Sequence, residues 1–267
     1  MGGGDDVEQF VALLRGQLPS GSIPLYGNDA TDQTVMDIPE AARDIAFGLA
    51  SRARNFAEPL ADAIRPYAGK ASILADIGAG SPYVAEAVLT AVPHLSRVIL
   101  VDRENGMQYA KEMAEAGDMN VAKLEFREHD FFRSIPPADL YCISNTAHDW
   151  LPEEYATIML NVRDSIAPGG VVCLHEPLLA TTWNSAEEWV HALWMACYAV
   201  TLFRLTEGKG TCYSREEHDL VMSQNGFVRM DDSVRTMDGC TALFYQLESD
   251  ASTSESSAAV QPRTATR

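Results

Sequence analysis

The stretch Ser72-Ile73-Leu74-Ala75-Asp76-Ile77-Gly78-Ala79-Gly80-Ser81-Pro82 joins a short apolar run to a glycine-rich turn. An apolar run of this length, bounded by turn residues, predicts a buried β-strand. Glycines directly after a strand permit a tight turn and let a ligand approach the backbone closely. The next apolar run ends at Asp102, about 20 residues further on, where a carboxylate can accept hydrogen bonds from ribose hydroxyls. The stretch therefore predicts the first strand and the ligand loop of an open α/β sheet.

Apolar runs and helical stretches alternate along the rest of the chain. Further strands are expected at 97–101, 123–127, 139–143, 171–174, 226–230 and 241–247. Helices are expected at 39–64, 83–92, 105–116, 153–166 and 186–203, with a short one at 7–14. Strands that alternate with helices predict a parallel sheet with right-handed crossovers. The last two strands follow each other without a helix, which indicates an antiparallel pair that closes the edge of the sheet.

The chain of 267 residues divides into three expected parts. A short helical N-terminal extension covers residues 1–44, one α/β domain covers 45–248, and a tail covers 249–267. The tail is rich in Ser, Thr and Ala, cannot bury enough apolar surface to offset its ordering entropy, and is expected to be disordered.

Composition excludes several classes of function. A net charge of −18, from 38 acidic and 20 basic residues, argues against a nucleic-acid partner, whose affinity rests on Lys and Arg. No apolar run approaches the ~20 residues that span a bilayer, and the N-terminus predicts neither a secretory leader nor a lipid anchor. The five cysteines form no CxxC pair, which predicts buried thiols in a reducing compartment, the cytoplasm, and no metal site.

The glycine turn is compatible with two classes of nucleotide cofactor. A dinucleotide fingerprint requires a third glycine where this chain has Tyr83, which argues against NAD. The segment Glu128-His129-Asp130-Phe131-Phe132 follows the third expected strand. Asp130 is suited to hold an adenine amino group while Phe131 packs on the ring. The alternative is an ordinary turn followed by two core aromatics.

A histidine follows the fourth expected strand in Asn145-Thr146-Ala147-His148-Asp149-Trp150. Ligands of open α/β sheets bind beyond the strand ends, and a neutral imidazole there can take a proton from a substrate. The alternative is a histidine that caps a helix or fills a turn.

Taken together, these segments resemble the catalytic domain of the class I S-adenosylmethionine-dependent O-methyltransferases that act on small phenolic or hydroxylated natural products. The resemblance covers about residues 45–247. The matching segments are Ala75–Gly80, Asp102, His129–Phe132, Ala147–Trp150, Ala167-Pro168-Gly169-Gly170, Leu174-His175-Glu176-Pro177, Gly208-Lys209-Gly210-Thr211 and Asn225-Gly226-Phe227.

This resemblance implies a Rossmann-like sheet of seven strands with helices on both faces and the last strand antiparallel. It also implies S-adenosyl-L-methionine as the cofactor, with Gly78 and Gly80 along its methionine part, Asp102 at the ribose, and Asp130 with Phe131 at the adenine. The other expected cofactor contacts are Asp76, Ala79, Arg103, Ser144 and Asn145. His148 matches the general base of the family.

The chemistry of methyl transfer agrees with that role. In-line displacement at a sulfonium methyl requires an aligned nucleophile. A phenol has a pKa of about 10, so a base that removes its proton speeds attack at neutral pH. Glu176 ends the strand expected beside the one before His148, roughly 5 Å away, and can orient the imidazole. Asp149 is the rival for that role, and either carboxylate can instead be a structural cap.

The apolar segment 183–198 is the expected wall of the acceptor site. Trp194, Met195 and Tyr198 are placed to sandwich an aromatic substrate, although a core-facing helix explains them equally well. Phe56 and Trp150 are the other expected substrate contacts, and His191 is a candidate second base.

The chain departs from the family pattern at several points. Pro82 stands where relatives carry a third glycine, Ser144 where many carry a Lys or Arg for the cofactor carboxylate, and Gly210 where plant members carry a catalytic Glu. About 45 residues precede the catalytic region, too few for the winged-helix dimerisation domain of the family, so a homodimer is left open.

The function expected from these features is O-methylation of a small hydroxylated, aromatic metabolite of secondary metabolism. The expected partner is this small-molecule acceptor, with no nucleic acid and no membrane. Three alternatives remain at this stage: N- or C-methylation, a rearrangement, decarboxylation or cyclisation that uses the cofactor without transferring its methyl, and a non-catalytic binder. Fold analogy alone does not separate them.

Overall fold

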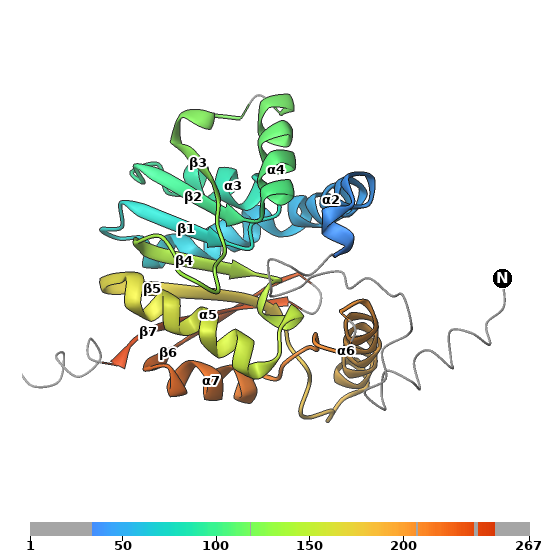
Figure 1. Cartoon of the computed structure of the whole chain (residues 1–267). Coiled ribbons are helices and arrows are strands. Elements are labelled where there is room, and N and C mark those ends of the chain that lie inside the picture. Colours follow the sequence, from blue (N-terminus) through green and yellow to red (C-terminus); the bar gives the residue numbers. More distant parts are fainter. Residues whose placement is uncertain (1–33, 118, 207, 238–239, 249–267) are drawn as a thin grey trace, which may run out of the picture.

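The computed structural model describes residues 34–117, 119–206, 208–237 and 240–248 (Figure 1). The helix expected at 7–14, most of the N-terminal extension and the expected disordered tail lie outside these residues.

Seven strands in the described part of the chain form one sheet, in the order β3-β2-β1-β4-β5-β7-β6. Strands β1 to β5 run parallel to one another, whereas β7 runs antiparallel to both of its neighbours, β5 and β6. Their bounds are β1 Ile73–Ile77, β2 Arg97–Asp102, β3 Leu124–Glu128, β4 Ala138–Ser144, β5 Ile166–Pro177, β6 Phe227–Met237 and β7 Cys240–Leu247.

Helices cover both faces of the sheet (Figure 1). Helices α2, α3 and α4 pack on one face, α5 and α7 pack on the other, and α6 lies beyond the strand ends, apart from both layers. Their bounds are α2 Pro39–Ile64, α3 Tyr83–Ala91, α4 Glu104–Ala116, α5 Pro152–Ser165, α6 Ala186–Leu205 and α7 Arg215–Gln224, with short 3-10 turns η1 Val35–Asp37, η2 Arg65–Tyr67, η3 Val121–Lys123 and η4 Ala147–Asp149.

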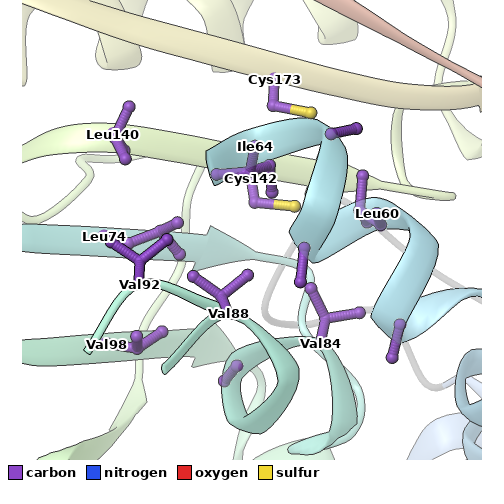
Figure 2. Packing of buried hydrophobic residues seen from close by; sticks show 14 of the residues in the cluster. Leu60, Ile64, Leu74, Val84, Val88, Val92, Val98, Leu140, Cys142 and Cys173 are labelled. Carbon is purple, nitrogen blue, oxygen red and sulfur yellow. The ribbon is translucent and has the colours of Figure 1, made fainter. Parts of the chain in front are cut away.

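Two apolar clusters sandwich the sheet because side chains alternate between its faces along each strand. Leu74 and Cys142 point into the cluster under α2 and α3, which Figure 2 shows, whereas Ala75 and Ile143 point into the cluster under α5 and α7. Because both faces are covered, the central parallel strands β1, β2 and β4 carry continuous apolar runs, whereas the edge strand β3 alternates apolar and charged residues. This explains why apolar runs located them in the sequence.

The predicted α/β architecture and the antiparallel last strand are confirmed, with two differences in detail. Helix α7 was not named from the sequence, although Ser214 and Glu217 form a capping box at its start. Of the five cysteines expected to be buried, Cys197 is exposed, because it lies on the outer side of α6, and the other four are buried.

The strand order reverses between β1 and β4, which is the switch point where open α/β sheets bind their ligands. The turn after β1, the end of β2 and the loop after β4 meet there. The fold thus brings together Gly78, Asp102 and His148, which are far apart in the sequence.

Candidate active site

A cavity of about 640 Å³ opens at the carboxyl ends of the parallel strands. Seven of the residues expected at the cofactor line it: Gly78, Gly80, Asp102, Arg103, Asp130, Phe131 and Asn145. Asp149 and Trp150 line it as well. Three expected cofactor contacts do not: Asp76 is buried beneath the turn, Ala79 packs toward the core, and the hydroxyl of Ser144 lies 2.8 Å from His175 Nδ1.

The glycine turn is held by its own backbone. The N–H groups of Gly78 and Ala79 both donate to the Val101 carbonyl, and the Gly80 N–H donates to Asp102 Oδ2 at 2.9 Å. These donors are therefore not available to a ligand. Without side chains, the glycines of the turn let a ligand in the cavity approach the backbone closely. Gly78, with a φ of 71°, also adopts the left-handed conformation that favours glycine.

Two carboxyl groups lie under this turn. Asp102 accepts backbone hydrogen bonds from Gly80 and from Arg103, the latter at 2.7 Å. Burial, reinforced by the charge of Asp102, raises the pKa of Asp76 to about 7. Asp76 therefore holds a proton more readily than a free carboxyl group, which limits the repulsion between the two groups.

The loop after β3 forms the opposite end of the cavity. Asp130 accepts a hydrogen bond from the Phe132 N–H at 3.0 Å and pairs with Arg133 at 3.2 Å. Trp150 packs edge-on against Phe131 and Phe132, with ring centroids 5.9 and 4.7 Å apart. Trp150, expected among the substrate contacts, thus lies beside the aromatic residues expected at the adenine.

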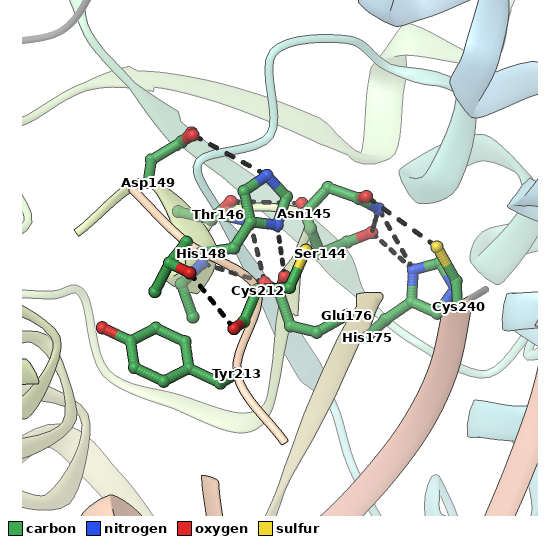
Figure 3. A network of polar contacts seen from close by, with 12 residues as sticks. Ser144, Asn145, Thr146, His148, Asp149, His175, Glu176, Cys212, Tyr213 and Cys240 are labelled. Carbon is green, nitrogen blue, oxygen red and sulfur yellow. Dashed lines mark hydrogen bonds and ion pairs between the residues drawn. The ribbon is translucent and has the colours of Figure 1, made fainter. Parts of the chain in front are cut away.

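His148 lies on the 3-10 turn η4 and is only 4% exposed. Its Nδ1 lies 2.5 Å from Glu176 Oε2, and its Nε2 lies 3.7 Å from Asp149 Oδ1, as Figure 3 shows. Only the contact with Glu176 is within hydrogen-bond distance. Glu176 rather than Asp149 is therefore the carboxylate that orients the ring.

Glu176 is itself fixed by the loop that carries the histidine. Its Oε1 accepts hydrogen bonds from the backbone N–H groups of Thr146 and Ala147, both at 2.9 Å (Figure 3). The carboxylate is fully buried and is placed by β5, the direct neighbour of β4. Because a carboxylate only accepts hydrogen bonds, the Nδ1–H of His148 donates to Glu176. The other ring nitrogen, Nε2, faces Asp149, which lines the cavity.

The electrostatics of the pair favour a charged imidazole. Burial acts to lower the pKa of His148, but the carboxylates of Glu176 and Asp149 outweigh burial and raise it. Burial likewise acts to raise the pKa of Glu176, and His148 outweighs burial and lowers it. Burial raises the pKa of Asp149 to about 6. His148 is thus a stronger base than a free imidazole.

Apart from Trp150, the aromatic residues expected at the acceptor lie near His148 and His175. The Tyr198 ring lies 6.0 Å from the His148 ring, and Trp194 stacks parallel to Tyr198 at 6.2 Å. Phe56, from α2, contacts the His175 ring at 4.8 Å. Met195 is fully buried, whereas Trp194 is 49% exposed, so α6 offers both a packed and an open side.

Three residues of the site were missed in the sequence. Thr146 packs its side chain against the glycine turn, and the Thr211 N–H donates to the His148 carbonyl at 2.8 Å. Arg52, on α2, donates a hydrogen bond to the Tyr198 hydroxyl at 2.8 Å. A Cβ at Gly210 would lie 2.9 Å from the His148 carbonyl oxygen, so the backbone at Gly210 packs directly on the histidine turn.

The described residues include no cluster of His, Cys, Asp or Glu side chains suited to a metal ion. They also include no helix with the length and hydropathy needed to cross a bilayer.

An open α/β sheet with a ligand-sized cavity at its switch point and a buried His–Glu pair beside it fits an enzyme that binds a small ligand and moves a proton. The profile of the family described as O-methyltransferase domain matches residues 39–228, and the chain belongs to this family.

Individual relatives agree with this assignment. Acetylserotonin O-methyltransferase of Gallus gallus is 31% identical over 135 residues, which cover 50% of this chain and 36% of that enzyme. Trans-resveratrol di-O-methyltransferase of Vitis vinifera is 33% identical over 93 residues, which cover 35% of this chain and 24% of that enzyme. The matched segments thus span well under two thirds of these relatives.

Solved structures share the fold over most of the chain. One of them is an O-methyltransferase family 2 protein from Planctomyces limnophilus, solved with apigenin. It matches with a TM-score of 0.70 at 26% identity, and the match covers 89% of this chain and 65% of that protein. The mitomycin 7-O-methyltransferase has a TM-score of 0.72 at 22% identity, covering 90% and 67%. The latter likeness concerns the fold alone.

Proposed function

We propose that this chain is an S-adenosylmethionine-dependent O-methyltransferase that acts on a small hydroxylated aromatic metabolite. The observation that carries the proposal is the buried pair in which Glu176 Oε2 holds His148 Nδ1 at 2.5 Å and leaves Nε2 as the base. A family profile over residues 39–228 supports the same reaction. We place the catalytic domain at residues 45–248.

The cavity suits S-adenosylmethionine in size and in chemistry. Its volume of about 640 Å³ is in the range of small-ligand sites. The Asp102 carboxylate would accept hydrogen bonds from the ribose hydroxyls, and Phe131, with Asp130 beside it, would hold the adenine. Asn145 and Arg103 would lie near the polar ends of the ligand. The bound cofactor supplies an electrophilic methyl group on a sulfonium.

The residues of the chain do the remaining work. His148 Nε2 takes the proton of the acceptor hydroxyl, which creates an oxyanion nucleophile. Glu176 fixes the tautomer of the ring and stabilises the imidazolium that forms. Tyr198 and Trp194 provide aromatic surface for an acceptor ring. The five free cysteines support action in a reducing compartment such as the cytoplasm.

Transfer of a labelled methyl group tests the proposal. The purified chain is incubated with methyl-labelled S-adenosylmethionine and a panel of phenols, and with the same compounds as methyl ethers. We expect label on the phenols and none on the ethers. Label on the ethers would indicate C-methylation, and an unlabelled new product would indicate a rearrangement. Calorimetry that detects no cofactor binding would leave a non-catalytic role.

The rate of transfer is expected to rise with pH, with an inflection above 6.5, the ordinary pKa of histidine. Only neutral His148 accepts a proton, and because its pKa is raised, the neutral form predominates only at higher pH. Asp149→Asn removes one of the charges that raise this pKa and is expected to move the inflection to lower pH. The measurement is kcat/KM against pH with an acceptor whose hydroxyl has a pKa of about 10. An inflection below 6.5, or an upward shift in Asp149→Asn, would contradict the assignment.

A further inference from the structure

Arg52 is a cation that lies close to His148. Arg52 occupies the face of α2 that also presents Leu49 to the cavity and Phe56 to His175, at spacings of three and four residues. Its Nη1 donates to the Tyr198 hydroxyl at 2.8 Å, and Tyr198 in turn contacts the His148 ring. One aromatic side chain therefore links the guanidinium to the base.

A second contact ties Arg52 to the cavity wall. Its Nη2 donates to Cys240 Sγ at 3.6 Å, and Cys240 Sγ lies 4.0 Å from Asn145 Oδ1. Asn145 lines the cavity. The guanidinium thus lies where α2, α6 and β7 meet, next to the wall of the cavity.

The charge of Arg52 has no counter-ion among its hydrogen-bond partners. Burial raises the pKa of Tyr198 to about 12 and that of Cys240 to about 11, despite the opposing effect of Arg52, so both partners are neutral at pH 7. Across the described ranges, Arg97, Arg127 and Arg229 each pair with a carboxylate, but Arg52 forms no such ion pair.

In the described part of the chain, both nearby carboxylates lie beside His148 and neither is within ion-pair distance of Arg52. Glu176 is committed to His148 and to two backbone N–H groups, and Asp149 lies beside His148 Nε2. A half-buried guanidinium has five N–H donors in a planar fork, and the two neutral contacts leave most of them unused. A carboxylate is the group that such a fork binds best.

We infer that Arg52 is a specificity-determining residue that binds a carboxylate carried by the aromatic acceptor, so that the substrate class is a hydroxylated aromatic acid. The inference rests on the proposed function, because it assigns the acceptor of that same site. The hydroxyl of the acid faces His148, and its carboxylate faces Arg52 beside the Tyr198 hydroxyl.

Binding of matched neutral and charged rings tests the inference. The probes are 2-, 3- and 4-hydroxybenzoate and the three corresponding hydroxybenzamides, titrated by calorimetry into protein saturated with S-adenosylhomocysteine. We expect at least one acid to bind about tenfold or more tightly than its amide, and Arg52→Gln to abolish this difference. Arg52→Lys keeps the charge without the fork and is expected to retain part of the preference.

Arg43→Gln is the matched control, because Arg43 lies exposed on the same helix and stacks only on Phe47. It is expected to keep the full preference. An equal loss of acid and amide binding in Arg52→Gln would make Arg52 a structural tie between helices and overturn the inference. Acids that bind no better than amides, or not at all, in the wild type would overturn it as well.

The same probes separate the inference from the proposed function. Acids that bind through Arg52 but receive no label from S-adenosylmethionine would contradict the proposed function and leave the carboxylate site in place. Label transferred to neutral phenols, with no preference for acids, would support the proposed function and contradict the role of Arg52.

Discussion

Replacing His148 with alanine is expected to lower kcat by at least ~100-fold with any phenol that the enzyme methylates. The imidazole Nε2 receives the hydroxyl proton. Glu176 cannot take over as the base, because its oxygens are occupied by His148 Nδ1, at 2.5 Å, and by the backbone N–H of Thr146. His148 does not line the cavity assigned to the cofactor, so the affinity for S-adenosylmethionine should change little. Single-turnover rates and calorimetry of cofactor binding measure the two effects separately.

The alanine variant also has a cost in stability. It leaves the fully buried Glu176 carboxylate without its cation, which costs about 3–5 kcal/mol when a buried pair is broken. His148→Asn keeps a side-chain N–H for Glu176 and is expected to be more stable than the alanine variant but equally inactive. His94→Ala is the control, since His94 is exposed and contacts only the Ala68 carbonyl. A folded asparagine variant with more than about a tenth of the wild-type kcat would exclude His148 as the base.

The sequence predicts that His148 and Glu176 lie close together if their two strands are neighbours in the sheet. Each follows or ends an apolar run, and a run covered on both faces is recognisable as a strand of a parallel sheet. Adjacent parallel strands bring their carboxyl ends together, so a glutamate at the end of β5 had to lie near the loop after β4. The choice between Glu176 and Asp149 required the geometry of η4, a single turn without an apolar period of its own.

Other features of the site are formed by contacts between segments and leave no local pattern. Nothing near Gly78 in the sequence indicates that the N–H groups of its turn donate hydrogen bonds to Val101 and Asp102. Arg52 lies on an amphipathic helix where a charged residue is typical of a solvated face, and only the approach of Tyr198 makes it part of the site. Trp150 is an expected substrate contact, but in the structure its ring packs edge-on against Phe131.

The largest effect on the cofactor is expected from Gly78→Ala. A Cβ at residue 78 would lie 2.6 Å from Thr146 Cγ2 and would also overlap Thr146 Oγ1, so one of the two loops must move. Thr146 is held by its hydroxyl to the Ser144 carbonyl at 3.1 Å and by its N–H to Glu176. Displacing it shifts the cavity wall and the His148–Glu176 pair together. Because a misplacement of about 1 Å can cost 100-fold, we expect kcat/KM to fall by ~100-fold or more.

Gly169→Ala separates the clash from the backbone cost. Gly169 has a φ of 75°, close to the 71° of Gly78, but a Cβ there meets no atom within 4 Å. Both variants therefore carry the left-handed penalty of about 1–2 kcal/mol, visible as a lower Tm, and only Gly78→Ala should weaken S-adenosylmethionine binding. The double variant Gly78→Ala with Thr146→Ala removes the two overlapping atoms and should recover most of the binding without recovering the Tm. Calorimetry of cofactor binding and thermal unfolding are measured for the wild type, the two single variants and the double variant. Normal cofactor affinity in Gly78→Ala would place the cofactor away from this turn. If the double variant bound the cofactor as weakly as Gly78→Ala does, the backbone conformation and not Thr146 would be what requires glycine.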